Sequence, residues 1–427
     1  MAHLLLVESW VGAMGTLLPR AISDLDAEFT FLTRRPEHYP SRLPDGSVHP
    51  LLSGRNVVTA ETNDPASALA AARQIHDETP LDGVLTSCDY YLSTAARIAT
   101  ELGLPGPTPE SVGVACDKSR TREVLDATGI PGPRNATAPI DDPRALRDAA
   151  DTVMFPLVVK PTDLCAGMFV RRADDWNDLE SAVTDLRSFE VNARGQPRTP
   201  VVLLEEFLNG PEFSVESWIR HGDIHTVGVT DKSLGGRSGF VETGHMFPAA
   251  LTGRDRSAVV AMAEAAVRAV GLDNTVVHTE LRLTPAGPRI IEINARPAGN
   301  QITELIRHVS GVDLPAVAVE LALGREPASP RPAQNDAARP RSAAVRMLVP
   351  EREGILGELK GADEVAGHPA VVNSHFKKRG HRIGVGVDNN SYLGNAIVLS
   401  PEEGGAGLLA DRLVSSISIE YAEGAAR

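Results

Sequence analysis

Cysteine is scarce in this chain, which contains only Cys88, Cys116 and Cys165 among its 427 residues. Their spacing matches neither a zinc site nor a framework of disulfide bonds. Disulfide-rich folds belong mostly to secreted proteins, whereas unpaired cysteines are typical of a reducing compartment. We therefore expect a cytoplasmic protein without a cysteine-ligated metal.

Long apolar stretches and an excess of positive charge are also missing. No apolar run reaches the roughly 18 residues of a membrane-spanning helix, and the opening MAHLLLVESW has too short an apolar part for a signal peptide. The 42 lysines and arginines are outnumbered by 56 aspartates and glutamates, for a formal net charge of −14. These features argue against a membrane or a nucleic acid as the main partner.

What the chain does contain is the pattern of an α/β protein. Its N-terminal part alternates apolar strands with helical stretches, which predicts a parallel sheet. A polar, proline-rich segment at 324–341 has the composition of a linker or a surface loop. We expect an N-terminal α/β domain, a central subdomain, a third domain with the main β-sheet and a small C-terminal domain, over residues 1–112, 113–195, 196–325 and 340–427.

Residues 276–300, VVHTELRLTPAGPRIIEINARPAGN, predict a β-hairpin that turns at its Pro-Ala-Gly segment. In that register Glu280 lies opposite Glu292, and two facing carboxylates repel each other. Asn294 and Arg296 share their face, because strand side chains alternate. The group is either a solvated sheet surface or an oxygen-ligand site for a hard cation, and Mg²⁺ carrying nucleotide phosphates fits the second alternative.

Two lysines stand at positions that a bound anion would explain. Lys160 ends the otherwise apolar strand FPLVVKP, so its ammonium must reach solvent, a carboxylate or another anion. Lys118 opens a helix, where the macrodipole disfavours a cation unless a phosphate shares that end. Each lysine taken alone is equally explained as an exposed side chain.

The segment EEFLNGPEF, residues 205–213, resembles the adenine hinge of the ATP-grasp superfamily, in which an acidic residue, an aromatic residue and a leucine end a strand and Gly-x-Glu follows. By this resemblance Glu205 meets the adenine amino group and Glu212 the ribose hydroxyls. The backbone of Glu206 and Leu208 reads the purine edge. The alternative is a charged strand end. The hinge residues expected to bind the nucleotide are Glu205, Glu206, Phe207, Leu208 and Glu212.

Further motifs follow in the order of that family, over about residues 1–325. Lys118 and Lys160 resemble the lysines that contact the α- and β-phosphates, and Lys232 resembles the lysine near the γ-phosphate. The segment TDLCAGMFV takes the place of the phosphate-covering loop but departs from the family in having a single glycine. Its expected phosphate cradle is the backbone of Cys165, Ala166, Gly167 and Met168.

The same resemblance implies a metal-binding role for the hairpin at 276–300. Glu280, Glu292 and Asn294 resemble the ligands of Mg²⁺, with two ions expected and Mn²⁺ as a substitute. Arg296 resembles the arginine that steadies the acyl phosphate and the tetrahedral intermediate. The resemblance implies an ATP-grasp architecture with a Rossmann-like N-terminal domain, a central subdomain, the ATP-grasp sheet and a lid-like C-terminal domain.

The segment ETGHMFPA, which begins at Glu242, resembles a part of bacterial L-amino-acid ligases, which make dipeptides. By this resemblance Glu242 and His245 line the substrate pocket, and His245 contacts the substrate carboxylate or assists proton removal from the amine. The alternative for His245 is a packed, hydrogen-bonded side chain. Gly299 stands near the start of a helix whose N–H groups are a further candidate for binding a carboxylate.

Taken together, these motifs imply an ATP-dependent carboxylate–amine ligase that joins small, amino-acid-like substrates through an acyl phosphate. Two alternatives stay open: an ATP-grasp carboxylase or purine-pathway ligase, and a nucleotide-binding protein without turnover. Many relatives of this kind are dimers, which leaves the oligomeric state open between a monomer and a homodimer.

Overall fold

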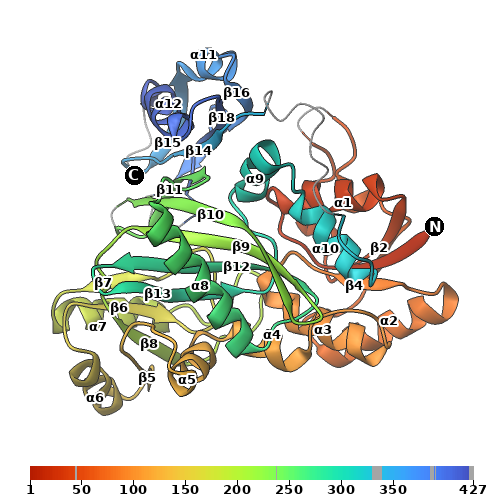
Figure 1. Ribbon diagram of the computed structural model, residues 1–427, viewed down its shortest axis with the longest axis horizontal. Coiled ribbons are helices and arrows are strands. Elements are labelled where there is room, and N and C mark those ends of the chain that lie inside the picture. Colours follow the sequence, from red (N-terminus) through yellow and green to blue (C-terminus); the bar gives the residue numbers. More distant parts are fainter. Residues whose placement is uncertain (44–45, 237, 329–338, 385–388, 390, 423–427) are drawn as a thin grey trace.

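The computed structural model describes residues 1–43, 46–236, 238–328, 339–384, 389 and 391–422. Its chain folds into several β-sheets with helices packed on them, which confirms the α/β class (Figure 1). Across the described residues, no helix combines the length and the apolar character needed to cross a membrane. Of the expected linker at 324–341, residues 329–338 lie outside the described part of the chain.

The N-terminal unit is a parallel four-stranded sheet in the order β3-β2-β1-β4. Alternate residues of β1 enter two cores, one shared with α1 and α10 and one shared with α2 and α3. Both faces of the strand are therefore buried, as its continuous apolar run predicted. The strands are β1 (Ala2–Val7), β2 (Ala27–Thr33), β3 (Asn56–Thr59) and β4 (Gly83–Leu85), and the helices are α1 (Met14–Asp24), α2 (Pro65–Glu78), α3 (Leu92–Glu101) and α10 (Leu314–Ala322).

The largest sheet has eight strands in the order β13-β12-β9-β10-β11-β14-β18-β16, and every neighbouring pair is antiparallel. The helix α8 (Gly253–Val270) packs on one face, while α9 (Ile302–Ser310) and α10 pack on the other. Its strands are β9 (Glu212–Arg220), β10 (Asp223–Gly235), β11 (Val241–Phe247), β12 (Thr275–Thr284), β13 (Gly287–Asn294), β14 (Ser342–Leu348), β16 (Val371–Phe376) and β18 (Gly394–Ser400). The last three strands come from beyond residue 340, so the C-terminal region extends this sheet.

Two smaller sheets flank the large one (Figure 1). The sheet β5-β8-β6-β7 forms its own core with α6 and α7, and the sheet β17-β15-β19 lies in the C-terminal region with α11 and α12. The bounds of these elements and of the connecting helices are α4 (Pro109–Cys116), α5 (Lys118–Thr128), β5 (Asn135–Pro139), α6 (Pro143–Val153), β6 (Leu157–Pro161), β7 (Arg171–Ala173), α7 (Trp176–Arg187), β8 (Val201–Glu206), β15 (Gly354–Lys360), α11 (Ala362–Ala366), β17 (Arg382–Ile383), α12 (Gly405–Ser415) and β19 (Ser418–Tyr421).

The register of the β12–β13 hairpin confirms the sequence prediction, because Glu280 pairs directly with Glu292. The helix that Lys118 was expected to open is also present as α5, and Gly129 closes it in the left-handed conformation with φ 71°. Glycine suits such a position because it has no Cβ to clash. Local patterning therefore accounts for the elements that carry the site.

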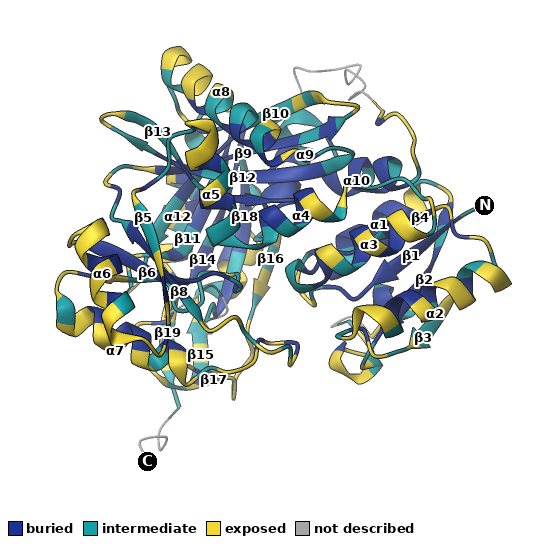
Figure 2. Ribbon diagram, turned by 90° about the horizontal axis from the view of Figure 1, so that it is seen from below, coloured by how far each residue is buried: buried dark blue, intermediate teal, exposed yellow. Residues whose placement is uncertain are grey.

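A single buried arginine ties α5 to two sheets. The guanidinium of Arg122 donates to Glu205 Oε1 at 2.7 Å, to the Ile290 carbonyl at 3.0 Å and to the Ile291 carbonyl at 2.6 Å. Glu205 belongs to β8, and the two isoleucines belong to β13. Figure 2 shows this central region as predominantly buried, and only 2% of Arg122 is exposed. The small sheet and the large sheet are thus joined through one charged group.

Replacing this arginine should loosen that junction. We expect Arg122→Met to lower the free energy of unfolding by about 3 kcal/mol, because it leaves the buried carbonyls and part of Glu205 without a partner. Urea unfolding followed by circular dichroism measures the loss. The matched control is Arg120→Met on the same helix, whose exposed ion pair with Glu110 should contribute less than about 1 kcal/mol. Equal losses in the two variants would contradict the structural role of Arg122.

Candidate active site

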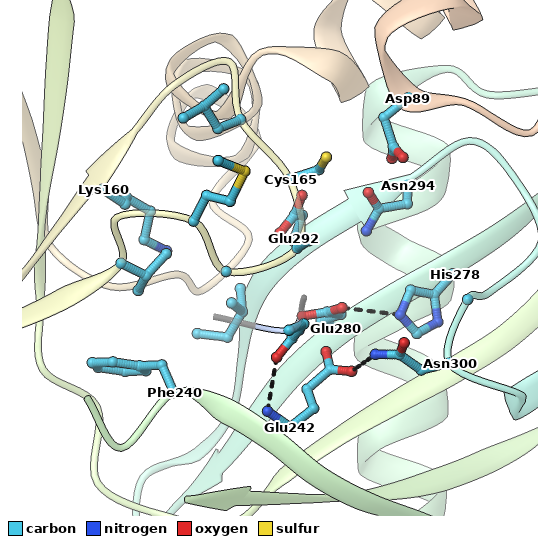
Figure 3. A pocket seen from close by; sticks show the side chains of 18 of the residues that line it. Asp89, Lys160, Cys165, Phe240, Glu242, His278, Glu280, Glu292, Asn294 and Asn300 are labelled. Atoms are coloured by element: carbon cyan, nitrogen blue, oxygen red, sulfur yellow. Dashed lines mark hydrogen bonds and ion pairs between the residues drawn. The ribbon is translucent and has the colours of Figure 1, made fainter. Parts of the chain in front are cut away.

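A cavity of about 430 Å³ lies where the N-terminal unit, the small β5–β8 sheet and the large sheet meet. All three contribute side chains, which Figure 3 shows pointing into the same space. Most of the residues expected to form the site line this cavity. They are Lys118, Lys160, Cys165, Ala166, Gly167, Met168, Glu205, Glu206, Phe207, Leu208, Glu212, Glu242, Glu280, Glu292, Asn294, Arg296 and Gly299.

The facing carboxylates of the hairpin are each held by a lysine. Lys232 Nζ lies 2.7 Å from Glu280 Oε1, and Lys118 Nζ lies 3.0 Å from Glu292 Oε1. Lys118 opens α5 directly after its N-cap residue, as the sequence predicted. Opposite charges at these distances offset the repulsion between the glutamates. The two lysines therefore stabilise the acidic pair without a bound metal or nucleotide.

Lys232 is the more deeply buried of the two lysines that contact the hairpin. Its ammonium lies within 3.3 Å of Glu212, 3.1 Å of Glu242 and 2.7 Å of Glu280, and its side chain is 1% exposed. Burial alone lowers the pKa of a lysine, but the three carboxylates, Glu242 first, raise the pKa of Lys232 well above its usual value. It lies behind the carboxylates instead of among the residues that line the cavity, so it acts on their charge and position.

His278 belongs to the site although the sequence analysis missed it. It stands two residues before Glu280 on β12, and one of its ring nitrogens lies 2.9 Å from Glu280 (Figure 3). The other ring nitrogen lies 2.9 Å from Glu216. Burial lowers the pKa of the imidazole, but these two glutamates raise it to about 9. The ring is therefore a cation near neutral pH, with both nitrogens donating. The signal was available, because residues two apart on a strand share a face.

The donor set of the hairpin suits a hard cation. Glu280, Glu292 and Asn294 line the cavity and offer carboxylate and amide oxygens, which are the ligands that Mg²⁺ takes in proteins. In the described part of the chain, no three His, Cys, Asp or Glu side chains are grouped so as to hold a metal ion by themselves. An ion held here would need further oxygen ligands, and nucleotide phosphates commonly supply them to Mg²⁺.

The strand pair β6–β8 builds the opposite wall. Glu205 is 2% exposed and pairs with Arg122 and with Lys160, whose Nζ lies 2.5 Å from Glu205 Oε2. Burial raises the pKa of such a carboxyl, but the two cations lower that of Glu205 to about 2. The carboxylate thus orients Lys160 at the cavity. A contact between Glu205 and the adenine amino group stays a prediction.

Arg282 is a further residue of this wall that sequence reasoning missed. Its Nε donates to Glu212 at 3.1 Å, and its Nη1 donates to the Leu208 carbonyl at 2.8 Å. Its guanidinium carbon lies 5.9 Å from the centre of the Phe207 ring and 5.8 Å from that of Phe240. The arginine therefore braces the hinge and the glutamate expected at the ribose.

The loop after β6 is only partly available as a phosphate cradle. Ala166 and Gly167 have left-handed backbones, with φ of 57° and 67°, a geometry that turns successive N–H groups outward. The N–H of Met168, however, donates to the Cys165 carbonyl at 3.2 Å. The N–H of Met168 is therefore used in a turn, and the expected phosphate cradle is limited to the backbone of Cys165, Ala166 and Gly167. Burial raises the pKa of the Cys165 thiol to about 12, so the thiol is neutral.

The substrate side of the cavity centres on Glu242. Its Oε2 accepts a hydrogen bond from the side-chain amide of Asn300 (Figure 3), and Asn300 itself adopts φ 47°. Asparagine tolerates this left-handed conformation better than most residues do, and such conformations cluster at functional sites. The carbonyl of Glu242 also accepts from Tyr392 Oη at 2.7 Å. The C-terminal region therefore holds the residue that the sequence analysis expects to face the substrate.

His245 does not line the cavity as the sequence analysis expected. It is completely buried on β11, with its Nε2 3.1 Å from Glu242 Oε2 but without hydrogen-bond alignment. A β-bulge in this part of β11 pairs Glu242 with Leu234 and His245 with Lys232, and these partners are two residues apart on β10. The side chains of Glu242 and His245 therefore lie on the same face of the sheet. A direct contact between His245 and substrate is therefore wrong for this structure. Its influence passes through Glu242.

Arg296 is aimed by a residue from the N-terminal unit. Its Nε lies 2.6 Å from Asp89 Oδ1, while Trp10 Nε1 donates to Asp89 Oδ2 at 2.8 Å. Asp89 follows β4 at the carboxyl edge of the parallel sheet, where such sheets bind ligands. Burial lowers the pKa of the guanidinium, but Asp89 raises it overall. Sequence reasoning missed Asp89 because 207 residues separate it from Arg296.

Three family models match successive parts of the chain, which correspond to its N-terminal unit, its central sheets and its C-terminal region. Residues 24–106 match the ATP-grasp N-terminal domain, residues 153–304 match the ATP-grasp domain, and residues 346–422 match the L-amino acid ligase C-terminal domain 2. The chain belongs to the ATP-grasp superfamily. Within it, the C-terminal match is to L-amino acid ligases, as the segment at Glu242 indicated.

Three curated relatives span different shares of this chain. The uncharacterized protein y4rH of Sinorhizobium fredii is 30% identical over 78% of this chain and 67% of its own length. Carnosine synthase 1 of Mus musculus is 28% identical over 69% of this chain and 36% of its own. Alanine–anticapsin ligase of Bacillus subtilis is 27% identical over 57% and 55%. The chain thus spans about a third to a half of the two characterised relatives.

A solved structure supports the fold over the whole chain. The L-amino acid ligase of Bacillus licheniformis superposes with a TM-score of 0.81 at 24% identity and covers 99% of both chains. This confirms the ATP-grasp architecture. With the family matches it makes the protein an ATP-grasp ligase related to amino-acid and dipeptide ligases, and ATP-grasp enzymes in general use ATP and Mg²⁺.

The nucleotide wall can be tested without knowing the other substrates. We expect Lys160→Met to weaken the binding of Mg-ADP at least about tenfold, because a charge-assisted contact to a phosphate is lost. Isothermal titration calorimetry measures the dissociation constant. The control is Lys360→Met, which removes an exposed ion pair with Glu420. An affinity within twofold of the parent for Lys160→Met would remove this lysine from the nucleotide site.

Proposed function

We propose that the protein joins a small carboxylic acid to the amine of a second, amino-acid-like molecule, at the expense of ATP and through an acyl phosphate. One observation carries this proposal. The oxygen donors Glu280, Glu292 and Asn294, the cation Arg296 and the acidic group of Glu242 converge on one cavity. A phosphate-handling half and an amine-binding half thus lie next to each other.

The first step is phosphoryl transfer to the acid. A substrate carboxylate oxygen bonds to the γ-phosphorus of ATP as the bond to the β–γ bridging oxygen breaks, which releases ADP. Lys118 and Lys160 offset phosphate charge, while Glu280, Glu292 and Asn294 would hold two Mg²⁺ ions. These ions would neutralise charge on the β- and γ-phosphates. Holding the reactants in line supplies most of the remaining acceleration.

In the second step the amine nitrogen attacks the acyl carbon, and inorganic phosphate departs. In this proposal Arg296 stabilises the negative oxygen that develops on that carbon, and the contact with Asp89 that orients its guanidinium supports the role. The nitrogen loses a proton, and the departing phosphate can accept it. No protein nucleophile is needed, because the phosphorylated acid is already activated.

Glu242 fits the role of an ammonium holder better than that of a base. Burial alone would raise its pKa, but Lys232, followed by His245, lowers the pKa of the Glu242 carboxyl well below its usual range. A carboxylate that stays ionised is a weak proton acceptor and a strong partner for a substrate ammonium. Asn300 fixes its orientation. We therefore place an α-amino group beside Glu242 and Asn300.

The C-terminal region helps to choose between the proposed ligase and the alternative enzyme classes. An ATP-grasp carboxylase or a purine-pathway ligase remains compatible with the ATP half of the cavity. The match of residues 346–422 to an L-amino acid ligase domain and the contact of Tyr392 with Glu242 favour amide formation. By its name, the relative alanine–anticapsin ligase joins an amino acid to a second molecule, which also supports amide formation as the proposal for this chain. A homodimer remains a prediction.

The proposal is tested by the release of ADP and phosphate from Mg-ATP in the presence of the twenty amino acids, singly and in pairs. Release that requires one particular pair, with the matching dipeptide found by mass spectrometry, is the expected result. Release with bicarbonate in place of an amino acid would favour the carboxylase instead. Binding of ATP without release under any condition would favour the protein without turnover.

A substitution in the hairpin separates an enzyme from a nucleotide binder. We expect Glu292→Ala to lower amino-acid-dependent ADP release at least about a hundredfold, because metal-ion stabilisation of the transferring phosphate contributes several kcal/mol. Circular dichroism should show an unchanged fold. The control is Glu123→Ala on the exposed face of α5, which should keep parent activity. Turnover at the parent rate in Glu292→Ala would show that the metal assignment is wrong.

A further inference from the structure

A second cavity, of about 360 Å³, lies between the N-terminal unit and the loop that precedes β8. Glu8 directly follows β1, and Arg34 and Arg35 directly follow β2, so the cavity lies at the carboxyl edge of the parallel sheet. Ligands bind at this edge in open α/β sheets. The lining residues are Glu8, Arg34, Arg35, His38, Tyr91, Val191, Ala193, Arg194 and Gly195.

The cavity is cationic in a strongly acidic protein. Three arginines line it, and Glu8 is the one acidic residue among the lining residues, which leaves a formal charge of +2. Both oxygens of Glu8 are occupied, since they accept from the hydroxyls of Thr33, Tyr39 and Thr62 and from the Arg34 N–H. Glu8 reaches Arg194 through the Tyr39 hydroxyl and offsets one of the three arginine charges, which leaves two without a counter-charge among the lining residues.

The arginines themselves have little counter-charge. The nearest carboxylate to Arg34 is the exposed Glu61, 3.6 Å from its Nε. Among the described residues, no carboxylate lies within 4.0 Å of the guanidinium of Arg35 or of Arg194. Arg35 and His38 are exposed, so solvent and small molecules can reach the cavity.

Arg194 is the unusual member, because it is 6% exposed and has no ionic partner in the described part of the chain. Its Nη2 donates to the Ser9 carbonyl, its Nη1 lies 3.4 Å from Tyr39 Oη, and its Nε is buried without a hydrogen-bond partner. Its guanidinium also lies 5.5 Å from the ring centres of Trp10 and Tyr39. The charge of Glu8 reaches Arg194 only through the Tyr39 hydroxyl, and a buried charge without a carboxylate in direct contact is costly. An anion close to this guanidinium would therefore be stabilised.

We propose that this cavity binds a small organic dianion, of which a phosphate monoester is the simplest example, with Arg34, Arg35 and Arg194 as its cationic contacts. Two negative charges match the formal charge of the wall. Arginine is the side chain best shaped to bind phosphate or carboxylate groups through paired N–H donors. The volume exceeds that of a free phosphate and lies in the range of small-molecule pockets, which leaves room for an organic body.

The site is separate from the proposed active site and does not depend on it. None of the residues that hold the expected phosphates or metal lines the second cavity. Ala193 contributes to both walls, and Arg194 packs over Trp10, which donates to Asp89. The loop at 191–195 therefore stands between the two cavities.

The test is a titration of the full chain with glycerol 3-phosphate and, separately, with succinate, at constant ionic strength and with Mg-ADP saturating the nucleotide site. We expect saturable binding at one site by calorimetry for at least one of these dianions, and no saturable binding of acetate. Binding of only one dianion identifies the preferred head group as phosphate or dicarboxylate. Saturable binding of neither dianion, or binding of acetate as tight as that of the dianions, would overturn the proposal.

Matched variants assign the binding to this cavity. Arg35→Gln changes an exposed side chain, so the fold should survive, and we expect the dissociation constant to rise about tenfold through loss of a charge-assisted contact. Arg97→Gln removes an exposed arginine of α3 that does not line the cavity and should leave the affinity within twofold. A dianion that binds Arg35→Gln as tightly as it binds the parent would place the ligand elsewhere.

Discussion

The structure depends on the compensation of buried charge around one acidic hairpin. Glu280 and Glu292 face each other across β12 and β13, and the protein tolerates them because Lys232, Lys118 and the protonated His278 lie within about 3 Å. These cations come from three different elements. The fold around the cavity therefore has to bring those elements together before the acidic pair can be buried. We propose this pair as the place where a metal–nucleotide complex binds.

Other polar and charged groups join the domains to this centre. Arg122 links the small sheet to the hairpin, Asp89 brings the N-terminal unit to Arg296, and Tyr392 brings the C-terminal region to Glu242. Each link is a buried or half-buried hydrogen bond, which is expensive to break and gives a defined geometry. The two halves of the proposed reaction thus share one cavity whose shape is set by contacts between domains.

Sequence patterning predicted the parts that depend on local order. The hairpin register followed from one turn and strand alternation, and the start of α5 at Lys118 followed from the local sequence. Sequence patterning could not predict the role of Asp89, because the tertiary fold alone brings it to Arg296. His245 shows the opposite failure: its identity suggested chemistry, but only the packing of β11 reveals that it is fully buried.

The most direct test of this account is a Mn²⁺ titration followed by electron paramagnetic resonance, with and without ADP. With Glu280, Glu292 and Asn294 as the proposed protein ligands, the account predicts weak binding of Mn²⁺ alone and much tighter binding when the nucleotide adds phosphate oxygens. Replacing Glu292 by alanine should remove that gain. An affinity for Mn²⁺ that ADP leaves unchanged would contradict the claim that this hairpin and the nucleotide form one metal site.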